Sequence, residues 1–271
     1  MQYEIKPLGV GGILDQSVQL LKNHFGLLMG ISLCVSVPFN LIIGLINISL
    51  VPEPPEILTA QAIQEYQQQV AGVSLKLAGL GLLSLILVYP LTTGAMTYAV
   101  ASEYLGRPTT VGASVGTAFR KFFPLLLTSV LMFIIVYIGL ILCIIPGLYF
   151  LVRYSLATYA VVLEGKMGIS ALKRSSELMT SDRTKNYNSL VLLWLLLGAI
   201  GFGVGAVTSI IPQAHVALVV SVLIQAVLAS FGAAAFAIFY FSCRCKAENF
   251  DLMLLAEAMG EGDDDPTPVA S

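Results

Sequence analysis

The sequence contains few charged residues, and this scarcity excludes most classes of water-soluble protein. Charged residues make up 11% of the 271 residues, whereas about 25% is usual for a soluble globular domain. Hydrophobic residues make up 57%, so a soluble fold would have too few polar side chains to cover its surface. The net charge of −2 indicates no particular partner, and we expect no nucleic acid among the partners. The composition therefore predicts a membrane protein.

Residues that usually carry out catalysis or bind metals are also scarce. The two histidines, His24 and His215, are predicted to lie on opposite sides of the bilayer. Neither an H-E-x-x-H motif nor a Walker-type phosphate-binding loop occurs. We therefore predict no enzyme activity, no metal site and no cofactor. The four cysteines, interpreted as structural or incidental thiols, are Cys34, Cys143, Cys243 and Cys245.

The positive charges are concentrated in four groups that alternate with long uncharged runs. Twelve of the 14 Lys and Arg residues fall within residues 6–22, 107–121, 166–185 and 244–246. Because membrane insertion retains Lys and Arg on the cytoplasmic side, we expect all four groups on that side. The pattern predicts a multi-pass protein of the cell inner (cytoplasmic) membrane, with both ends of the chain in the cytoplasm.

The uncharged runs predict six transmembrane helices, because about 20 apolar residues are enough to cross a bilayer. The tripeptide Ile145-Pro146-Gly147 separates the third from the fourth and is typical of a tight turn, since proline lacks an N–H donor and glycine tolerates positive φ. A single membrane domain is expected over residues 1–258, followed by a disordered acidic tail at 259–271. The predicted spans are residues 25–51, 77–102, 123–145, 147–163, 189–211 and 216–242.

An internal repeat is visible at two predicted span ends. Residues 97–103 and 158–164 agree at five of seven positions, and they end in Glu103 and Glu164. Each segment precedes a stretch of mixed apolar and basic character, and a similar stretch opens the chain. Helices of this kind lie in the membrane interface. We therefore predict an all-α polytopic membrane protein of three hairpins, each preceded by a cytoplasmic amphipathic interfacial helix; the alternative is chance similarity among apolar sequences.

Two residue types inside the spans have a structural interpretation. Small residues let membrane helices approach closely, and this is the role we predict for Gly198, Gly201, Gly203 and Gly205. Tyrosines near span ends are typical of the aromatic belt at the membrane surface. The tyrosines assigned to this belt are Tyr98, Tyr104, Tyr149, Tyr154, Tyr159, Tyr187 and Tyr240.

Residues 139–178 contain several recognisable elements, and two more lie near the start of the chain. They are Ile144-Ile145-Pro146-Gly147, Val152-Arg153, Glu164-Gly165 and Ala171-Leu172-Lys173-Arg174-Ser175, together with Ile13-Leu14-Asp15 and Lys22-Asn23-His24-Phe25. In these elements the chain resembles a bacterial and archaeal family of six-span proteins known as the membrane domain of glycerophosphoryl diester phosphodiesterases. The resemblance implies a six-span fold. Some members carry a soluble phosphodiesterase domain after the membrane part, and we expect that catalytic domain to be absent here, where a short acidic tail follows.

Four residues are candidates for a binding site. Arg153 is the one charge inside a predicted span, about 9 Å from the expected outer turn. It either binds an anion or headgroup in a polar pocket beside the second or sixth span, or extends to the outer surface. Glu103, Glu164 and Arg174 lie near other charges at predicted cytoplasmic helix ends. They either bind a lipid headgroup or a partner, or form ion pairs that anchor the interfacial helices.

These features predict a non-enzymatic integral inner-membrane protein, a scaffold or accessory protein in envelope or lipid processes. Its expected partners are membrane lipids and other membrane proteins. The alternative is a transporter or lipid-handling protein with a polar cavity lined by Arg153. A polar central cavity would favour the alternative, and a tightly packed bundle would favour the scaffold.

Overall fold

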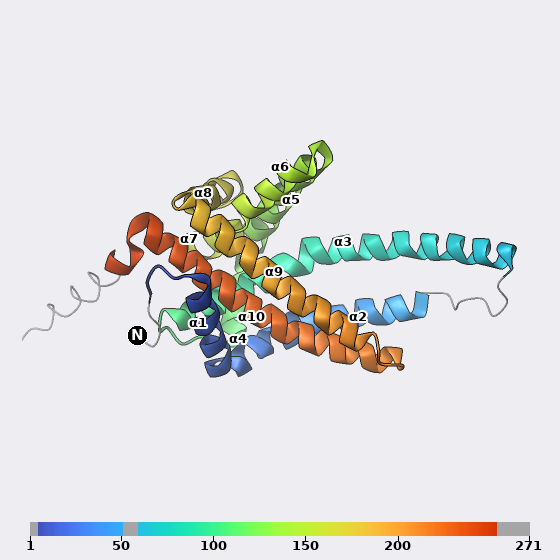
Figure 1. The fold of residues 1–271 in the computed structure, drawn as a ribbon. Coiled ribbons are helices and arrows are strands. Elements are labelled where there is room, and N and C mark those ends of the chain that lie inside the picture. Colours follow the sequence, from blue (N-terminus) through green and yellow to red (C-terminus); the bar gives the residue numbers. More distant parts are fainter. Residues whose placement is uncertain (1–4, 51–58, 254–271) are drawn as a thin grey trace, which may run out of the picture.

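The computed structural model describes residues 5–50 and 59–253, and all regular secondary structure in these two ranges is helical. Its helices are numbered along the chain and arranged as Figure 1 shows. The predicted tail at 259–271 lies outside the described residues. The helices are α1 (Val10–Asn23), α2 (Phe25–Leu50), α3 (Ala60–Tyr104), α4 (Val111–Arg120), α5 (Phe122–Leu142), α6 (Ile144–Tyr154), α7 (Ala157–Glu164), α8 (Ile169–Thr180), α9 (Arg183–Thr208) and α10 (Ala214–Glu248).

Six helical segments of the described chain are long and apolar enough to cross a membrane. They are α2, most of α3, α5, the consecutive pair α6 and α7, α9, and α10. In each segment most residues of the apolar stretch are not buried inside the protein. Each segment therefore presents a large apolar surface, as helices that contact lipid do. This confirms the all-α fold class and the number of apolar segments that the sequence predicts.

Helix α3 is much longer than the predicted second span. The sequence predicts a span over residues 77–102, whereas the structure has one continuous helix from Ala60 to Tyr104. Its 45 residues correspond to about 68 Å at 1.5 Å per residue, about twice the thickness of a bilayer core. The Thr59 hydroxyl caps the first turn by accepting a hydrogen bond from the Ala62 N–H. Pro90 lies inside the helix without ending it.

The expected tight turn at Ile145-Pro146-Gly147 is wrong. The chain reverses at Cys143 instead, and Pro146 and Gly147 belong to the first turn of α6. Proline is tolerated there because the first N–H groups of a helix have no partner within the helix. Gly147 does not adopt positive φ. The predicted fourth span is also interrupted, since α6 ends at Tyr154 and α7 begins at Ala157.

The four basic groups of the sequence meet at one end of the bundle, which we call the basic end. It carries α1, α4, α8 and the last turns of α10 (Figure 1). Contacts between distant segments join these elements. The Leu8 N–H donates to the Ser242 hydroxyl over 2.9 Å, and the Lys121 ammonium donates to the Val162 carbonyl. Near the end of α10, Lys246 Nζ donates to the Asn186 Oδ1 atom over 2.9 Å.

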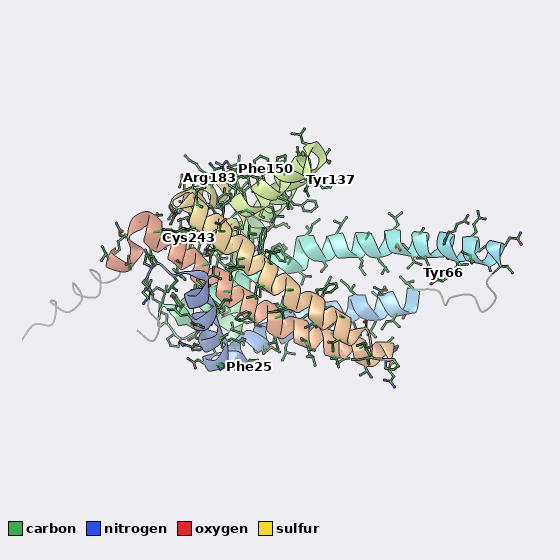
Figure 2. All side chains as sticks on the ribbon, viewed as in Figure 1. Phe25, Tyr66, Tyr137, Phe150, Arg183 and Cys243 are labelled. Carbon is green, nitrogen blue, oxygen red and sulfur yellow. The ribbon has the colours of Figure 1, made fainter. Side chains whose placement is uncertain are left out.

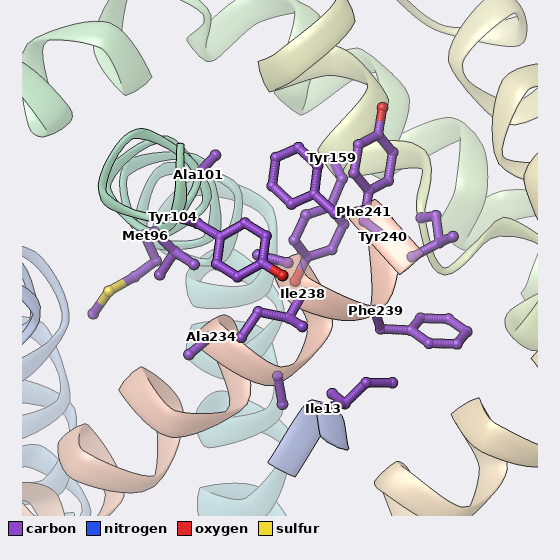
Figure 3. Packing of buried hydrophobic residues seen from close by; sticks show 14 of the residues in the cluster. Ile13, Met96, Ala101, Tyr104, Tyr159, Ala234, Ile238, Phe239, Tyr240 and Phe241 are labelled. Atoms are coloured by element: carbon purple, nitrogen blue, oxygen red, sulfur yellow. The ribbon is translucent and has the colours of Figure 1, made fainter. Parts of the chain in front are cut away.

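The main hydrophobic core lies toward the basic end and is built largely on α10 (Figure 3). Tyr104 stacks on Phe241 with ring centroids 5.4 Å apart. Tyr159 stacks on Tyr240 at 5.9 Å. These three tyrosines are almost completely buried, so the prediction that they belong to an aromatic belt is wrong. They are core residues, and the hydroxyl groups of Tyr104 and Tyr240 donate to the side chains of Gln16 and Glu164.

The glycines of α9 do not have the close-packing role that the sequence predicts. A Cβ atom at Gly198, Gly203 or Gly205 would meet no atom within 4 Å. At Gly201 it would make only an ordinary contact with Leu228, at 3.6 Å. No close contact between helices therefore depends on these four glycines in the described structure. The close approach of helices occurs elsewhere, between α5 and α6.

Candidate functional site

A network of charged side chains lies at the basic end and joins α7, α8 and α10. At its centre, Arg174 Nε donates to both carboxylate oxygens of Glu164, at 2.9 and 2.8 Å. The Tyr240 hydroxyl donates to the same carboxylate. Arg174 also pairs with Glu248. We call this network the Glu164 cluster, and its members are Glu164, Lys166, Arg174, Tyr240, Arg244 and Glu248.

Local structure explains why Glu164 occupies the centre. It is the last residue of α7, and the helix ends there because Gly165 adopts the left-handed conformation with φ 69°. The turn that follows brings α8 back, so that Arg174 faces the carboxylate. The exposed fractions of the Glu164 and Arg174 side chains are only 13% and 12%. The sequence prediction that these two residues lie together is consistent with this geometry.

The charges of the Glu164 cluster compensate one another. Burial lowers the pKa of the Arg174 guanidinium, but hydrogen bonds and charges from Glu164 and Glu248 outweigh burial, and the pKa lies above its usual value. Arg244 Nε lies 3.8 Å from Glu164 and 3.3 Å from Glu248. Such mutually satisfied charges hold helices in a fixed arrangement.

Glu103 lies in a separate site. Its carboxylate accepts a hydrogen bond from the Thr109 N–H over 2.9 Å and lies 3.2 Å from His24 Nδ1. It thereby joins the end of α3 to the junction between α1 and α2. Like Glu164, it lies in the last turn of a helix that is followed by a glycine with positive φ; here α3 ends at Tyr104, and Gly106 has φ 74°. The sequence placed Glu103 and Glu164 in equivalent positions, and the structure gives them different partners.

Arg153 does not have the surroundings that the sequence predicts. Its Nε donates to the Ser176 hydroxyl over 2.7 Å, and its Nη1 donates to the Tyr149 hydroxyl over 3.0 Å. These partners lie on α8 and α6, whereas a pocket beside the second or sixth span was expected. The reason is that α8 packs across the junction between α6 and α7, where the Ser175 hydroxyl donates to the Arg153 carbonyl. Sequence spacing alone cannot reveal that contact.

A second arginine approaches the same tyrosine. Arg183, the first residue of α9, lies with its guanidinium carbon 5.7 Å from the Tyr149 ring centroid, as does that of Arg153. Its Nη2 donates to the Tyr149 hydroxyl over 3.4 Å. Among the described residues, no carboxylate forms an ion pair with either arginine. Two positive charges therefore converge here without an ion-pair partner in the described part of the chain.

Arg153 does not line either of two cavities found among the described residues. The first has a volume of about 310 Å³ and is lined mainly by residues of α3 and α5, with others from α6, α7, α9 and α10. Its walls are mostly apolar and include Ile86, Tyr89, Phe133, Val136, Trp194 and Phe236. The second, about 520 Å³, lies at the basic end between the segment before α1 and the start of α9, beside Asp182 and Lys185. The polar cavity lined by Arg153 therefore stays a prediction.

The sequence also contains one G-x-S-x-G pattern, which is typical of serine hydrolases, at residues 112–116. In those enzymes the serine occupies a sharp turn between a strand and a helix. Here the pattern lies inside α4. Ser114 is fully buried, and its hydroxyl donates to the Thr110 carbonyl over 2.9 Å. Within the described residues, no group of three potential metal-binding side chains is found either.

Sequence reasoning missed three members of these sites. Glu248 lies four residues after Arg244 on α10, a spacing that favours an ion pair and could have indicated the contact. His24 immediately precedes the first apolar run, but nothing in its spacing points to Glu103. Tyr240 lies in an apolar helix, and only the fold brings its hydroxyl to Glu164.

The apolar helices and the composition indicate a membrane protein. Residues 115–271 match the family described as a domain of unknown function, DUF8558, and the chain belongs to this family. The match includes Arg153, Glu164 and Arg174, and Glu103 lies before it. No curated protein and no solved structure matches the chain. The similarity to the membrane domain of glycerophosphoryl diester phosphodiesterases stays a prediction.

Proposed function

We propose that the protein is a non-enzymatic integral protein of the inner (cytoplasmic) membrane that serves as a scaffold or accessory protein in envelope or lipid processes. The Glu164 cluster carries this proposal. Its charged side chains bind one another and join three helices. The cavity of about 310 Å³ in the apolar part of the protein is mostly lined by hydrophobic side chains. A rigid surface at the basic end suits assembly with lipids or other membrane proteins better than chemistry.

The proposed orientation puts the basic end in the cytoplasm, with α1, α4 and α8 in the membrane interface. The burial pattern supports this assignment. Helix α1 buries Ile13 and Leu20 and exposes Lys22, while α8 buries Leu172 and Leu178 and exposes Lys173. Each helix thus has one apolar face against the protein and basic groups available to anionic headgroups.

Reporter fusions test this orientation. Fusions after residues 24, 110 and 180 should report the cytoplasm, because positive charges are retained there. Fusions after residues 60 and 213 should report the opposite side. A cytoplasmic signal at residue 60 would overturn the proposed topology.

Cells that lack this protein provide the functional test. Envelope integrity, measured as entry of an apolar fluorescent dye, should be restored by the unaltered chain and by Lys185→Gln. Lys185 is a suitable control because its side chain is 78% exposed in a pair with Asp182. Arg174→Gln should fail to restore integrity at equal membrane abundance, because it separates α8 from α7 and α10. Restoration by Arg174→Gln would contradict the scaffold proposal.

A second function, lipid handling, is favoured by the convergence of Arg153 and Arg183 on Tyr149. Two guanidinium groups without a carboxylate attract a phosphate, which can accept hydrogen bonds from both. The basic end would then bind the headgroup of an anionic membrane lipid. Native mass spectrometry should detect retained phosphatidylglycerol in preference to phosphatidylcholine. Substitution of both arginines by glutamine should abolish the preference, whereas Lys173→Gln, an exposed cation on α8, should keep it.

If the unaltered protein retains both lipids equally, the lipid-handling function is excluded and the scaffold proposal is unaffected. In the dye-entry test, failure of Arg153→Gln together with success of Arg174→Gln would favour lipid handling over the scaffold.

A further inference from the structure

The tip of the α5–α6 pair is unusually apolar for a loop that should face water. Around Cys143, the exposed fractions of the side chains are 71% for Ile141, 81% for Leu142, 68% for Ile144 and 77% for Ile145. Exposing such side chains to water would be costly, because apolar surface is stabilised by removal from water. In Figure 1 this tip projects away from the rest of the bundle. Other protein segments of the described chain do not cover it.

The connection between α9 and α10 has more polar groups. It runs from Ser209 to Gln213, where these two polar residues flank Ile210 and Ile211, and His215 follows in the first turn of α10. The segment from Ile141 to Ile145 has no such polar side chain. The turn after α9 is therefore better suited to the water at a membrane surface than the tip of the α5–α6 pair.

The contact between α6 and α9 limits how deeply the tip can extend. Tyr149 packs on Tyr187 with ring centroids 6.0 Å apart. Cys143 is six residues from Tyr149, which corresponds to about 9 Å of helix. Thr208, at the far end of α9, is 21 residues from Tyr187, or about 32 Å. The part of α6 between Tyr149 and the tip is therefore much too short to reach the level in the membrane at which α9 ends.

The length of α5 leads to the same conclusion. The Thr128 hydroxyl accepts a hydrogen bond from the Gly168 N–H, just before α8, over 2.9 Å. Leu142, at the end of α5, is 14 residues further along, or about 21 Å. The hydrocarbon core is about 30 Å thick. The α5–α6 pair also diverges from α9 and α10 (Figure 1). Arg183 lies beside the base of the pair, and Tyr137 lies nearer its tip (Figure 2). Because the pair is inclined, the depth that it reaches in the membrane is smaller than its length.

The backbone at the tip reverses over a short segment. The Cys143 N–H donates to the Gly139 carbonyl over 3.0 Å, and the Gly147 N–H donates to the Cys143 carbonyl over 3.4 Å. Pro146 has no N–H to satisfy. The groups left outside the helical hydrogen bonds are the N–H groups of Ile144 and Ile145 and the last three carbonyls of α5. A reversal with one non-helical residue limits the free-energy cost of such groups inside a bilayer, which a longer loop would raise.

We propose that α5 and α6 form a re-entrant hairpin, which enters the membrane from the basic end and turns back inside the hydrocarbon core. Lipid acyl chains cover its tip, and neither water nor a second copy of the chain does so. This inference rests on the proposed membrane orientation. Four helices, α2, α3, α9 and α10, then cross the bilayer completely. Both ends of the chain stay on one side of the membrane, because four complete crossings are an even number and a re-entrant hairpin returns to the side from which it entered.

Cys143 allows a test in a nearly unaltered protein. A single substitution, Ser209→Cys, adds a thiol at the exposed turn between α9 and α10. Intact cells are treated from outside with a membrane-impermeant maleimide, and the labelled peptides are identified by mass spectrometry. We expect the introduced thiol to react and Cys143 to react at less than about one tenth of that rate, because charged reagents do not enter hydrocarbon. Comparable rates would overturn the proposal.

A nitroxide label on Cys143 in lipid vesicles provides a second measurement. Oxygen concentrates in the bilayer core and a nickel chelate stays in water, so frequent collisions with oxygen and rare collisions with nickel are expected. Frequent collisions with nickel would place the tip in water, and rare collisions with both would show a protein contact; either result overturns the proposal. If the thiol introduced at position 209 is unreactive from outside, and a fusion after residue 213 reports the cytoplasm, the membrane orientation itself fails.

Discussion

Gly139 of α5 and Gly147 of α6 lie in direct backbone contact. A Cβ atom added to Gly139 would lie 2.9 Å from the Gly147 Cα atom, and one added to Gly147 would lie 2.7 Å from the Leu140 backbone nitrogen. Backbone atoms cannot move aside as the end of a side chain can. Any side chain at these positions must therefore separate the two helices just below the tip that Cys143 forms.

Gly147→Ala should destabilise the protein by about 1–3 kcal/mol, as overpacking usually does. The measurement is thermal unfolding in detergent, followed by the helical circular dichroism signal. Gly203→Ala is the matched control, because a Cβ atom there meets open space. Alanine favours a helix over glycine by about 1 kcal/mol, so the control should be neutral or slightly stabilised. Equal melting temperatures for both variants would contradict the close contact.

The α5–α6 reversal illustrates what the sequence could predict. Hydropathy identified the apolar segments because each one is long and almost free of charge. The residue pair Pro146-Gly147 was ambiguous, since proline suits both a tight turn and the first turn of a helix. Local sequence could not distinguish the two. The contact between Gly139 and Gly147 decides it, and that contact depends on how α6 packs along α5.

The charged residues give a similar result. The proximity of Glu164 and Arg174 follows from a short, local return of the chain, and the sequence was sufficient to predict it. The surroundings of Arg153 depend on α8 crossing the junction between α6 and α7, which is a tertiary contact. The partners of Glu103 are likewise specific to the folded protein, because His24 lies 79 positions earlier in the chain. The internal repeat, which would make Glu103 and Glu164 equivalent, stays a prediction.

Arg174→Gln should cost about 1.5–3 kcal/mol of unfolding free energy, the usual contribution of hydrogen bonds to charged groups. The substitution removes the guanidinium that binds Glu164 and Glu248 together and leaves both carboxylates short of a partner. Lys185→Gln should change stability by less than about 0.5 kcal/mol, as exposed ion pairs do. Denaturant titration in mixed micelles measures both values. A loss for Arg174→Gln as small as that of the control would show that the cluster does not hold the helices.

Glu103→Gln should lower the stability of the protein less than Glu164→Gln does. The amide can still accept the Thr109 N–H bond through its oxygen, so only the contact with His24 is weakened. Glu164 has two arginines, a lysine and a tyrosine around its carboxylate, and its neutral variant leaves those cations without compensation. We expect the loss of unfolding free energy for Glu103→Gln to be less than about half of the loss for Glu164→Gln. The same melting experiments on both variants decide this, and a reversed order would refute it.

Ile144→Asp tests the energetic consequence of the re-entrant hairpin. At the centre of a bilayer an aspartate costs about 2.5–3.5 kcal/mol, whereas on a wet turn it costs little. Ile144 is 68% exposed and Ile210, in the turn after α9, is 78% exposed, so neither substitution disturbs the protein core directly. Ile210→Asp is therefore the matched control. The amount of each variant recovered from membranes, with its melting temperature in lipid nanodiscs, should fall for Ile144→Asp only. If both variants accumulate equally and melt together, the tip of the α5–α6 pair lies in water and the hairpin crosses the bilayer.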